Sequence, residues 1–163
     1  MATMIEREVV VQRIFDAPRS KVWKAWTEPD EFSKWWGPKD FTAPFIRMDL
    51  RVGGGYLYCM RGAGPDGVIR DYWNTGKFVE IVPMQRIAAE MSFADADGEM
   101  VPAWHYGLPG EWPDSIMLTV TFEDIGGGQT KVTVRESGIP GVMIDMAGHG
   151  WEQSFDKLAE SLK

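Results

Sequence analysis

The sequence predicts a single α+β domain, in which a long C-terminal helix lies across a curved antiparallel sheet of about seven strands and closes a ligand-sized apolar cavity. Three observations predict this fold class. The chain has 163 residues, which is the length of one domain, so we expect one domain over residues 1–163. Its middle alternates apolar and polar residues, as half-buried strands do. Its last segment places apolar residues every three or four positions, as an amphipathic helix does.

The candidate strands share this alternation and are separated by turns rich in glycine or proline. They are expected at residues 9–15, 41–48, 56–60, 72–81, 86–93, 116–123 and 131–135. At the end of the last one, Glu136 continues the parity of Val132 and Val134. We interpret the strand as ending at Arg135 with Glu136 in solvent. The alternative is an inward carboxyl group, which would have to be paired, hydrogen-bonded or neutral.

Two short helices are expected between the first and second strands. Pro18 suits the first turn of one helix, and apolar residues follow it at helical spacing. Thr27, which precedes Pro29, predicts the cap of a second helix that ends at Gly37.

The closing helix carries one apolar stripe, formed by Ile144, Ala147, Trp151, Phe155, Leu158 and Leu162. It is the only helix long enough to cover the open face of the sheet. Trp151 and Phe155 are one turn apart, and Tyr56 and Tyr58 share one strand face. We therefore predict that the two pairs face one another across a gap.

The connection from Ala94 to Pro113 is long and rich in Gly, Pro and Trp. Loops of this length in compact domains are usually functional or disordered. Trp104, Tyr106 and Trp112 argue against disorder because they offer too much apolar surface. We predict an ordered flap that docks by these aromatic residues over one end of the sheet.

Composition excludes several classes of partner. The net charge of −7 and the pI near 4.8 oppose binding to nucleic acid and to anionic membranes. No apolar run is long enough to cross a bilayer. Glu6, Arg7 and Glu8 interrupt any signal peptide, and the single cysteine, Cys59, precludes an internal disulfide. We expect a cytoplasmic protein.

No motif indicates a cofactor or a metal. The two histidines, His105 and His149, lack neighbouring ligands at metal-binding spacing. Cys59 lies in a strand without an adjacent histidine, so we expect it to pack rather than to react. No nucleophile elbow or catalytic triad order is recognisable, and the catalytic residues, if any, are unknown.

Four segments resemble the bacterial members of the family of activator-of-heat-shock-protein-ATPase homologues. They are FDAPRSKVWKAWTEPDEFSKWWGP (Phe15 to Pro38), GGGYLYCM (Gly53 to Met60), VPAWHYGLPGEWP (Val101 to Pro113) and GHGWEQSFDKLAESL (Gly148 to Leu162). The resemblance follows the order of nearly the whole chain. It implies the helix-grip fold of START-like and Bet v-type domains, the SRPBCC superfamily, with a cavity between sheet and helix. It implies no common catalytic residues.

The leading hypothesis is therefore a binding protein, in a setting such as a stress response, that takes a small apolar or aromatic ligand. Rings edged by hydroxyl and indole N–H groups are typical of such a pocket. The expected lining residues are Trp36, Tyr56, Tyr58, Trp73, Met91, Trp104, His105, Tyr106, Leu118, Trp151 and Phe155.

Two alternatives stay open, and so does a homodimer. The first is a co-chaperone-like module that stimulates a heat-shock chaperone ATPase, which predicts an exposed apolar patch. The co-chaperones of the resembling family carry a second, N-terminal domain that we do not expect here. The second is a cofactor-independent enzyme of the cyclase, dehydratase or hydrolase type. It predicts an inward His, Glu or Tyr cluster with perturbed pKa values.

Overall fold

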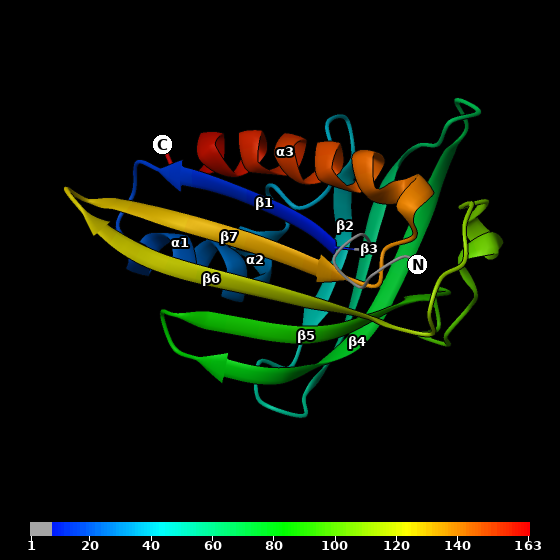
Figure 1. Cartoon of the computed structure of the whole chain (residues 1–163), viewed down its shortest axis with the longest axis horizontal. Coiled ribbons are helices and arrows are strands. Elements are labelled where there is room, and N and C mark those ends of the chain that lie inside the picture. Colours follow the sequence, from blue (N-terminus) through cyan, green and yellow to red (C-terminus); the bar gives the residue numbers. More distant parts are fainter. Residues whose placement is uncertain (1–7) are drawn as a thin grey trace.

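Seven antiparallel strands form one curved sheet in the order β1-β7-β6-β5-β4-β3-β2 (Figure 1). The structure is a computed structural model and describes residues 8–163. The strands are β1 (Glu8–Phe15), β2 (Thr42–Met48), β3 (Gly55–Ala63), β4 (Ile69–Val82), β5 (Arg86–Ala94), β6 (Ile116–Gly126) and β7 (Gln129–Ser137). The predicted fold class is confirmed.

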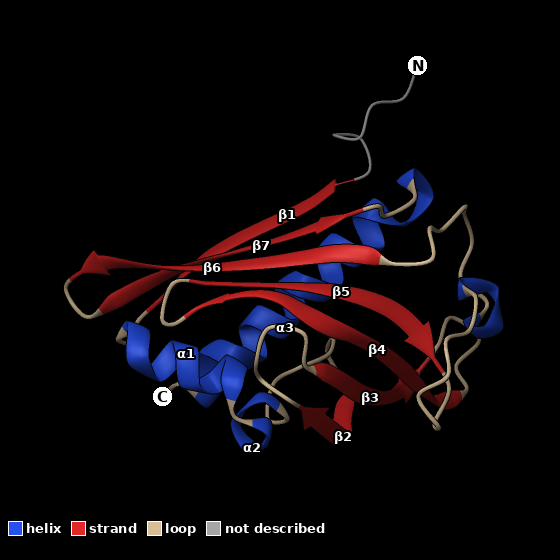
Figure 2. Cartoon of the chain, turned by 90° about the horizontal axis from the view of Figure 1, so that it is seen from below, coloured by secondary structure: helices blue, strands red, loops and turns tan. Residues whose placement is uncertain are grey.

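The helices lie within the curve of this sheet (Figure 2). They are α1 (Arg19–Thr27), α2 (Pro29–Phe32) and α3 (Ile144–Ser161), with short 3-10 turns at η2 (Ala103–Tyr106) and η3 (Gly141–Met143). We call the sheet face toward them the inner face. It carries most of the buried apolar side chains, including Tyr56, Phe78, Val120 and Val134.

Two expectations concern targeting and membranes. The prediction that the chain has no signal peptide depends on Glu6 and Arg7, which lie outside the described residues. Across residues 8–163, no helix combines the length and the apolar character needed to cross a bilayer.

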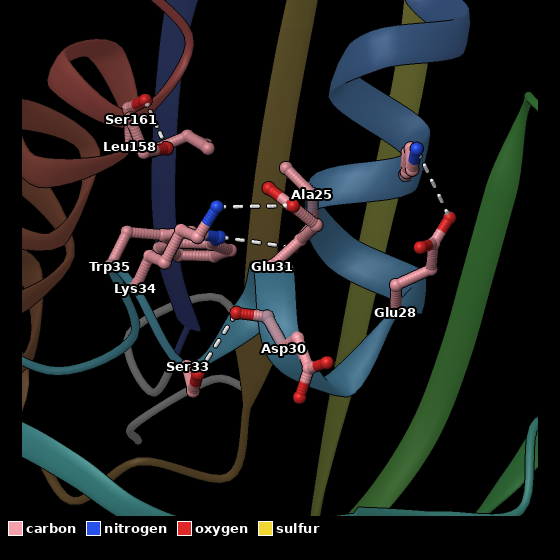
Figure 3. A network of polar contacts seen from close by, with 10 residues as sticks. Ala25, Glu28, Asp30, Glu31, Ser33, Lys34, Trp35, Leu158 and Ser161 are labelled. Carbon is pink, nitrogen blue, oxygen red and sulfur yellow. Dashed lines mark hydrogen bonds and ion pairs between the residues drawn. The ribbon is translucent and has the colours of Figure 1, made fainter.

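The second helix differs from the prediction because its expected cap is engaged elsewhere. The Thr27 hydroxyl donates to the backbone oxygen of Trp23 at 2.8 Å, within α1, and Glu28 takes the N-cap position of α2. The helix is a single turn that ends at Phe32. The indole of Trp35 follows it into the core, where its Nε1 donates to the backbone oxygen of Ala25 at 3.0 Å (Figure 3).

The closing helix packs its apolar stripe mainly against β1, and one of its rings contacts α1. The Phe155 ring meets Phe15 edge-on with centroids 5.4 Å apart, and the Trp151 ring stacks on Trp26 at 5.9 Å. The rings of Tyr56 and Tyr58 instead contact those of Phe32, Trp36 and Phe78. No ring contact joins the two pairs within the described part of the chain, and the gap between them stays a prediction.

One lysine fastens the helix to the loop that precedes β2. Lys157 Nζ donates to the backbone oxygens of Gly37, Pro38 and Phe41 at 3.0, 3.2 and 2.9 Å. These three bonds satisfy carbonyl groups that no strand or helix uses. The contact fixes the C-terminal part of α3 to the loop between α2 and β2.

Two of the three aromatic residues of the flap dock on the sheet, and one does not. The Tyr106 hydroxyl donates to the backbone oxygen of Ala94 and accepts from the backbone N–H of Trp73. The Trp112 ring packs against Phe93 with centroids 5.1 Å apart. Trp104 is 76% exposed, so the prediction was wrong for this residue. The 3-10 turn at η2 directs its side chain outward while it directs that of Tyr106 toward the sheet.

Candidate functional site

The site is organised around Glu136, which is buried. β7 does not end at Arg135 but continues to Ser137, and it keeps its pairing with both neighbouring strands. Glu136 lies opposite Val9 of β1 and Leu118 of β6. Its exposed fraction is only 8%. The interpretation of Glu136 as a solvated residue was therefore wrong, and the inward alternative is correct.

The carboxyl group of Glu136 has a single hydrogen-bond partner among residues 8–163. Trp151 Nε1 on α3 donates to its Oε1 at 2.9 Å. Burial raises the pKa of Glu136 to about 7, and the bond from Trp151 opposes this shift. No lysine, arginine or histidine in the described part of the chain forms an ion pair with it. The group can therefore change its charge near neutral pH.

Two buried tyrosines lie side by side on β3, and the charge of Glu136 acts on the hydroxyl of Tyr56. Their ring centroids are 4.4 Å apart, and the Tyr56 hydroxyl donates to the backbone oxygen of Glu90 at 2.8 Å. Burial raises the pKa of both hydroxyls; for Tyr56, the charges of Tyr58, Glu136 and Glu90 raise it further. Both hydroxyls are consequently neutral hydrogen-bonding groups at any physiological pH.

The inner face is not sealed near Glu136. Leu118, directly opposite the carboxyl-bearing residue, is partly exposed although it lies on a central strand. Met91 on β5 and Trp151 on α3 are partly exposed as well. Apolar side chains that face inward are normally covered, so this is where a small molecule could reach the interior. We define the inner-face site as Tyr56, Tyr58, Met91, Leu118, Glu136 and Trp151.

Two further predicted lining residues adjoin the site: Trp36, which is partly exposed, and Phe155, which is buried. The Trp36 ring lies 5.2 Å from that of Tyr58. Phe155 is 0% exposed beneath Trp151, and the two ring centroids are 6.0 Å apart. Both residues contact side chains of the site, Trp36 that of Tyr58 and Phe155 that of Trp151.

Four predicted residues are not brought into the site. Trp73 pairs with Cys59 on the opposite face of the sheet, where its ring contacts that of Phe45. Trp104 and His105 are exposed on the flap, and Tyr106 fastens the flap to β4 and β5. We leave these four residues out of the site.

The register of β4 explains why Trp73 was placed on the wrong face of the sheet. Trp73 belongs to a strand whose register against β3 places Asn74, not Trp73, beside Tyr58. A strand with large residues at Tyr72 and Trp73 gives no sequence signal for choosing between its faces. Glu136 is different, because its parity with Val134 already indicated the inner face.

Other features of the described residues lie outside this site. Within residues 8–163, no three His, Cys, Asp or Glu side chains come together as metal ligands would. Cys59 is buried on the other face of the sheet, and burial raises the pKa of its thiol to about 11. One surface hollow lies between β1 and the start of α3, beside His149, and another lies beside Lys157. Neither includes a residue of the inner-face site, and an enclosed cavity stays a prediction.

A curved antiparallel sheet that holds a long C-terminal helix against its inner face defines a helix-grip protein. Comparison with known families agrees with this class. Residues 16–163 match the family described as "Activator of Hsp90 ATPase homolog 1-like protein". The chain belongs to this family.

Solved structures give the same fold. Protein CV1439 from Chromobacterium violaceum is 27% identical with a TM-score of 0.75, and the match covers 96% of each chain. A protein from Arthrobacter aurescens is 24% identical with a TM-score of 0.75, covering 99% of this chain and 89% of that one. The AHSA1 (SPO3351) protein from Silicibacter pomeroyi is 18% identical with a TM-score of 0.72, covering 95% and 96%. A comparison with curated proteins found no match.

Proposed function

We propose that this protein binds a small apolar or aromatic molecule at the inner-face site. The observation that carries the proposal is the partial exposure of Leu118 and Met91, which lie on the inner face of two central strands next to the buried Ala89, Ile116 and Val120. A few polar groups, the Glu136 carboxyl and the Tyr58 hydroxyl, lie among these apolar and aromatic side chains. Apolar linings with a small number of placed polar groups are characteristic of small-molecule sites.

Filling the site should weaken the binding of a small aromatic molecule. Leu118→Trp places a bulky ring beside Glu136. We expect it to weaken the binding of a neutral aromatic probe, indole, by about tenfold or more, because a loss of about 1.4 kcal/mol of binding free energy lowers the affinity tenfold. Isothermal titration calorimetry measures the change. The matched control is Thr119→Trp, which adds the same ring on the opposite face of β6 and should leave the affinity for indole unchanged. Equal affinities in the two variants, or no saturable binding of indole to the unmodified protein, would contradict the proposal.

A second function is favoured by one specific observation. The cofactor-independent enzyme considered above needs an inward acid or base with a perturbed pKa, and Glu136, with its pKa near 7, meets that description. General acid–base groups act best when their pKa lies near the working pH. A chaperone partner, which the family name suggests, has no comparable support from the inner-face site.

The enzyme hypothesis can be tested without knowing the substrate. Molecules that co-purify with Glu136→Gln protein would be extracted, identified by mass and incubated with unmodified protein. An enzyme should convert at least one of them to a product of different mass or retention time, while Glu136→Gln should not. Molecules recovered unchanged from both incubations would leave the binding function and remove the catalytic one.

A further inference from the structure

We infer that the ligand of the inner-face site is a small amine or another organic cation, whose positive group pairs with the Glu136 carboxylate while its apolar body lies against Leu118 and Trp151. This inference rests on the proposed function and names its ligand class. It begins with an imbalance of charge inside the protein, because the acidic group of the site has no cationic partner among residues 8–163.

The first step concerns the unused bonding capacity of Glu136. A carboxylate accepts several hydrogen bonds, and in the described structure Oε1 accepts one, from Trp151 Nε1 at 2.9 Å. A buried charge is normally paired, because desolvation without a partner costs several kcal/mol. A bound cation would supply both the missing charge and the missing donors, as a charge-assisted hydrogen bond does.

The second step concerns the sign of the surroundings. The ionisable group on which the charge of Glu136 acts is the hydroxyl of Tyr56, which is neutral, and Glu90 lies beyond Tyr56. β1 and β6 contribute only Val9 and Leu118 opposite Glu136. Nothing here would offset the charge of an anionic ligand, so carboxylates such as fatty acids should be rejected.

The third step concerns the aromatic rings. Trp151 both bonds to the carboxyl group and stacks on Trp26 with ring planes 14° apart, while Tyr56 and Tyr58 contribute two further rings from β3 on the same inner face. Indole and phenol faces attract cations. Leu118, which pairs with Glu136 across β6 and β7, is partly exposed to solvent. Together these features favour a cation over a neutral molecule of equal size.

The test compares three probes of similar shape and different charge: 2-phenylethylamine, 2-phenylethanol and 3-phenylpropionate. At about pH 8, where Glu136 is ionised, calorimetry should show the amine binding about tenfold tighter than the alcohol, with the carboxylate weakest. Glu136→Gln should reduce the amine affinity about tenfold and change the alcohol affinity less than about twofold. Gln keeps an acceptor for Trp151 Nε1, so the variant should fold. The control Glu123→Gln removes an equal charge from an exposed position on β6 and should leave all three affinities unchanged.

A second measurement does not need a variant. Lowering the pH from about 8 to about 5 protonates Glu136 but leaves the amine charged, so the preference for the amine over the alcohol should disappear. Binding of the alcohol with no preference for the amine at either pH would overturn the inference and leave the proposed function standing. Failure of all three probes to bind would overturn both.

Discussion

Phe155→Ala should lower the free energy of unfolding by about 3–5 kcal/mol. The residue is 0% exposed in the middle of α3, and its ring lies edge-on to Phe15 and close to Trp151. Truncation removes the transfer free energy of the ring and leaves a cavity that closely packed neighbours fill only in part. Urea denaturation followed by circular dichroism measures the change.

The control for this substitution is Met146→Ala on the same helix. Met146 is 54% exposed, so its truncation should change stability by less than about 0.5 kcal/mol. A loss below about 2 kcal/mol for Phe155→Ala would show that the ring already borders empty space. That outcome would contradict a filled core here and would favour the gap predicted between the helix and the tyrosines of β3.

The order and type of the main elements could be predicted because apolar residues recur at a spacing typical of a strand or of a helix in each of them. The alternation from Ile116 to Phe122 admits only a strand with one buried face, and the stripe from Ile144 to Leu162 admits only a helix. Strand ends were predicted less well: β6 runs on to Gly126, and β4 already begins at Ile69. Cross-strand pairing extends these strands through polar residues, and a single strand's sequence does not carry that information.

The site was predicted in part, for a related physical reason. The spacing of Tyr56 and Tyr58 places them on one face of their strand, and the spacing of Trp151 and Phe155 places them on one face of their helix. Neither conclusion depends on how the strands pair. Trp73 could not be assigned, because its face depends on its register with Cys59 across β3 and β4. Whether a flap residue such as Trp104 belongs to the site depends on the geometry of the loop. A loop has no periodic sequence pattern from which that geometry could be predicted.

For Glu136, the spacing along the strand and the usual exposure of carboxylates led to opposite predictions. Its spacing from Val134 indicated the inner face, whereas the usual behaviour of carboxylates indicated solvent. The pairing of β7 with β1 and β6 up to Ser137 fixes the inner orientation. The sheet therefore holds the carboxyl group in a place that disfavours its charge, and residues that break a general rule in this way are often functional.

This placement predicts how stability depends on pH. In the folded protein the pKa of Glu136 is about 7, against an ordinary value of 4.5. Between these two values the folded state binds more protons at this residue than the unfolded state does. The free energy of unfolding therefore falls as the pH rises between these two values. A carboxylate whose pKa is lowered by a salt bridge has the opposite effect. The destabilisation is complete above about pH 7 and absent below about pH 4.5.

Glu136→Gln should consequently be more stable than the unmodified protein at about pH 8, by about 3 kcal/mol, which is the shift in pKa converted at about 1.4 kcal/mol per pH unit. At about pH 5 the two proteins should differ little, because the carboxyl group is then protonated and Gln resembles it in size. Urea denaturation at a series of pH values measures the difference, with Glu123→Gln as the exposed control that should follow the unmodified protein throughout. Parallel pH profiles for Glu136→Gln and the unmodified protein would show that Glu136 is not held in a charge-excluding environment, and the pairing with an organic cation would lose its physical basis.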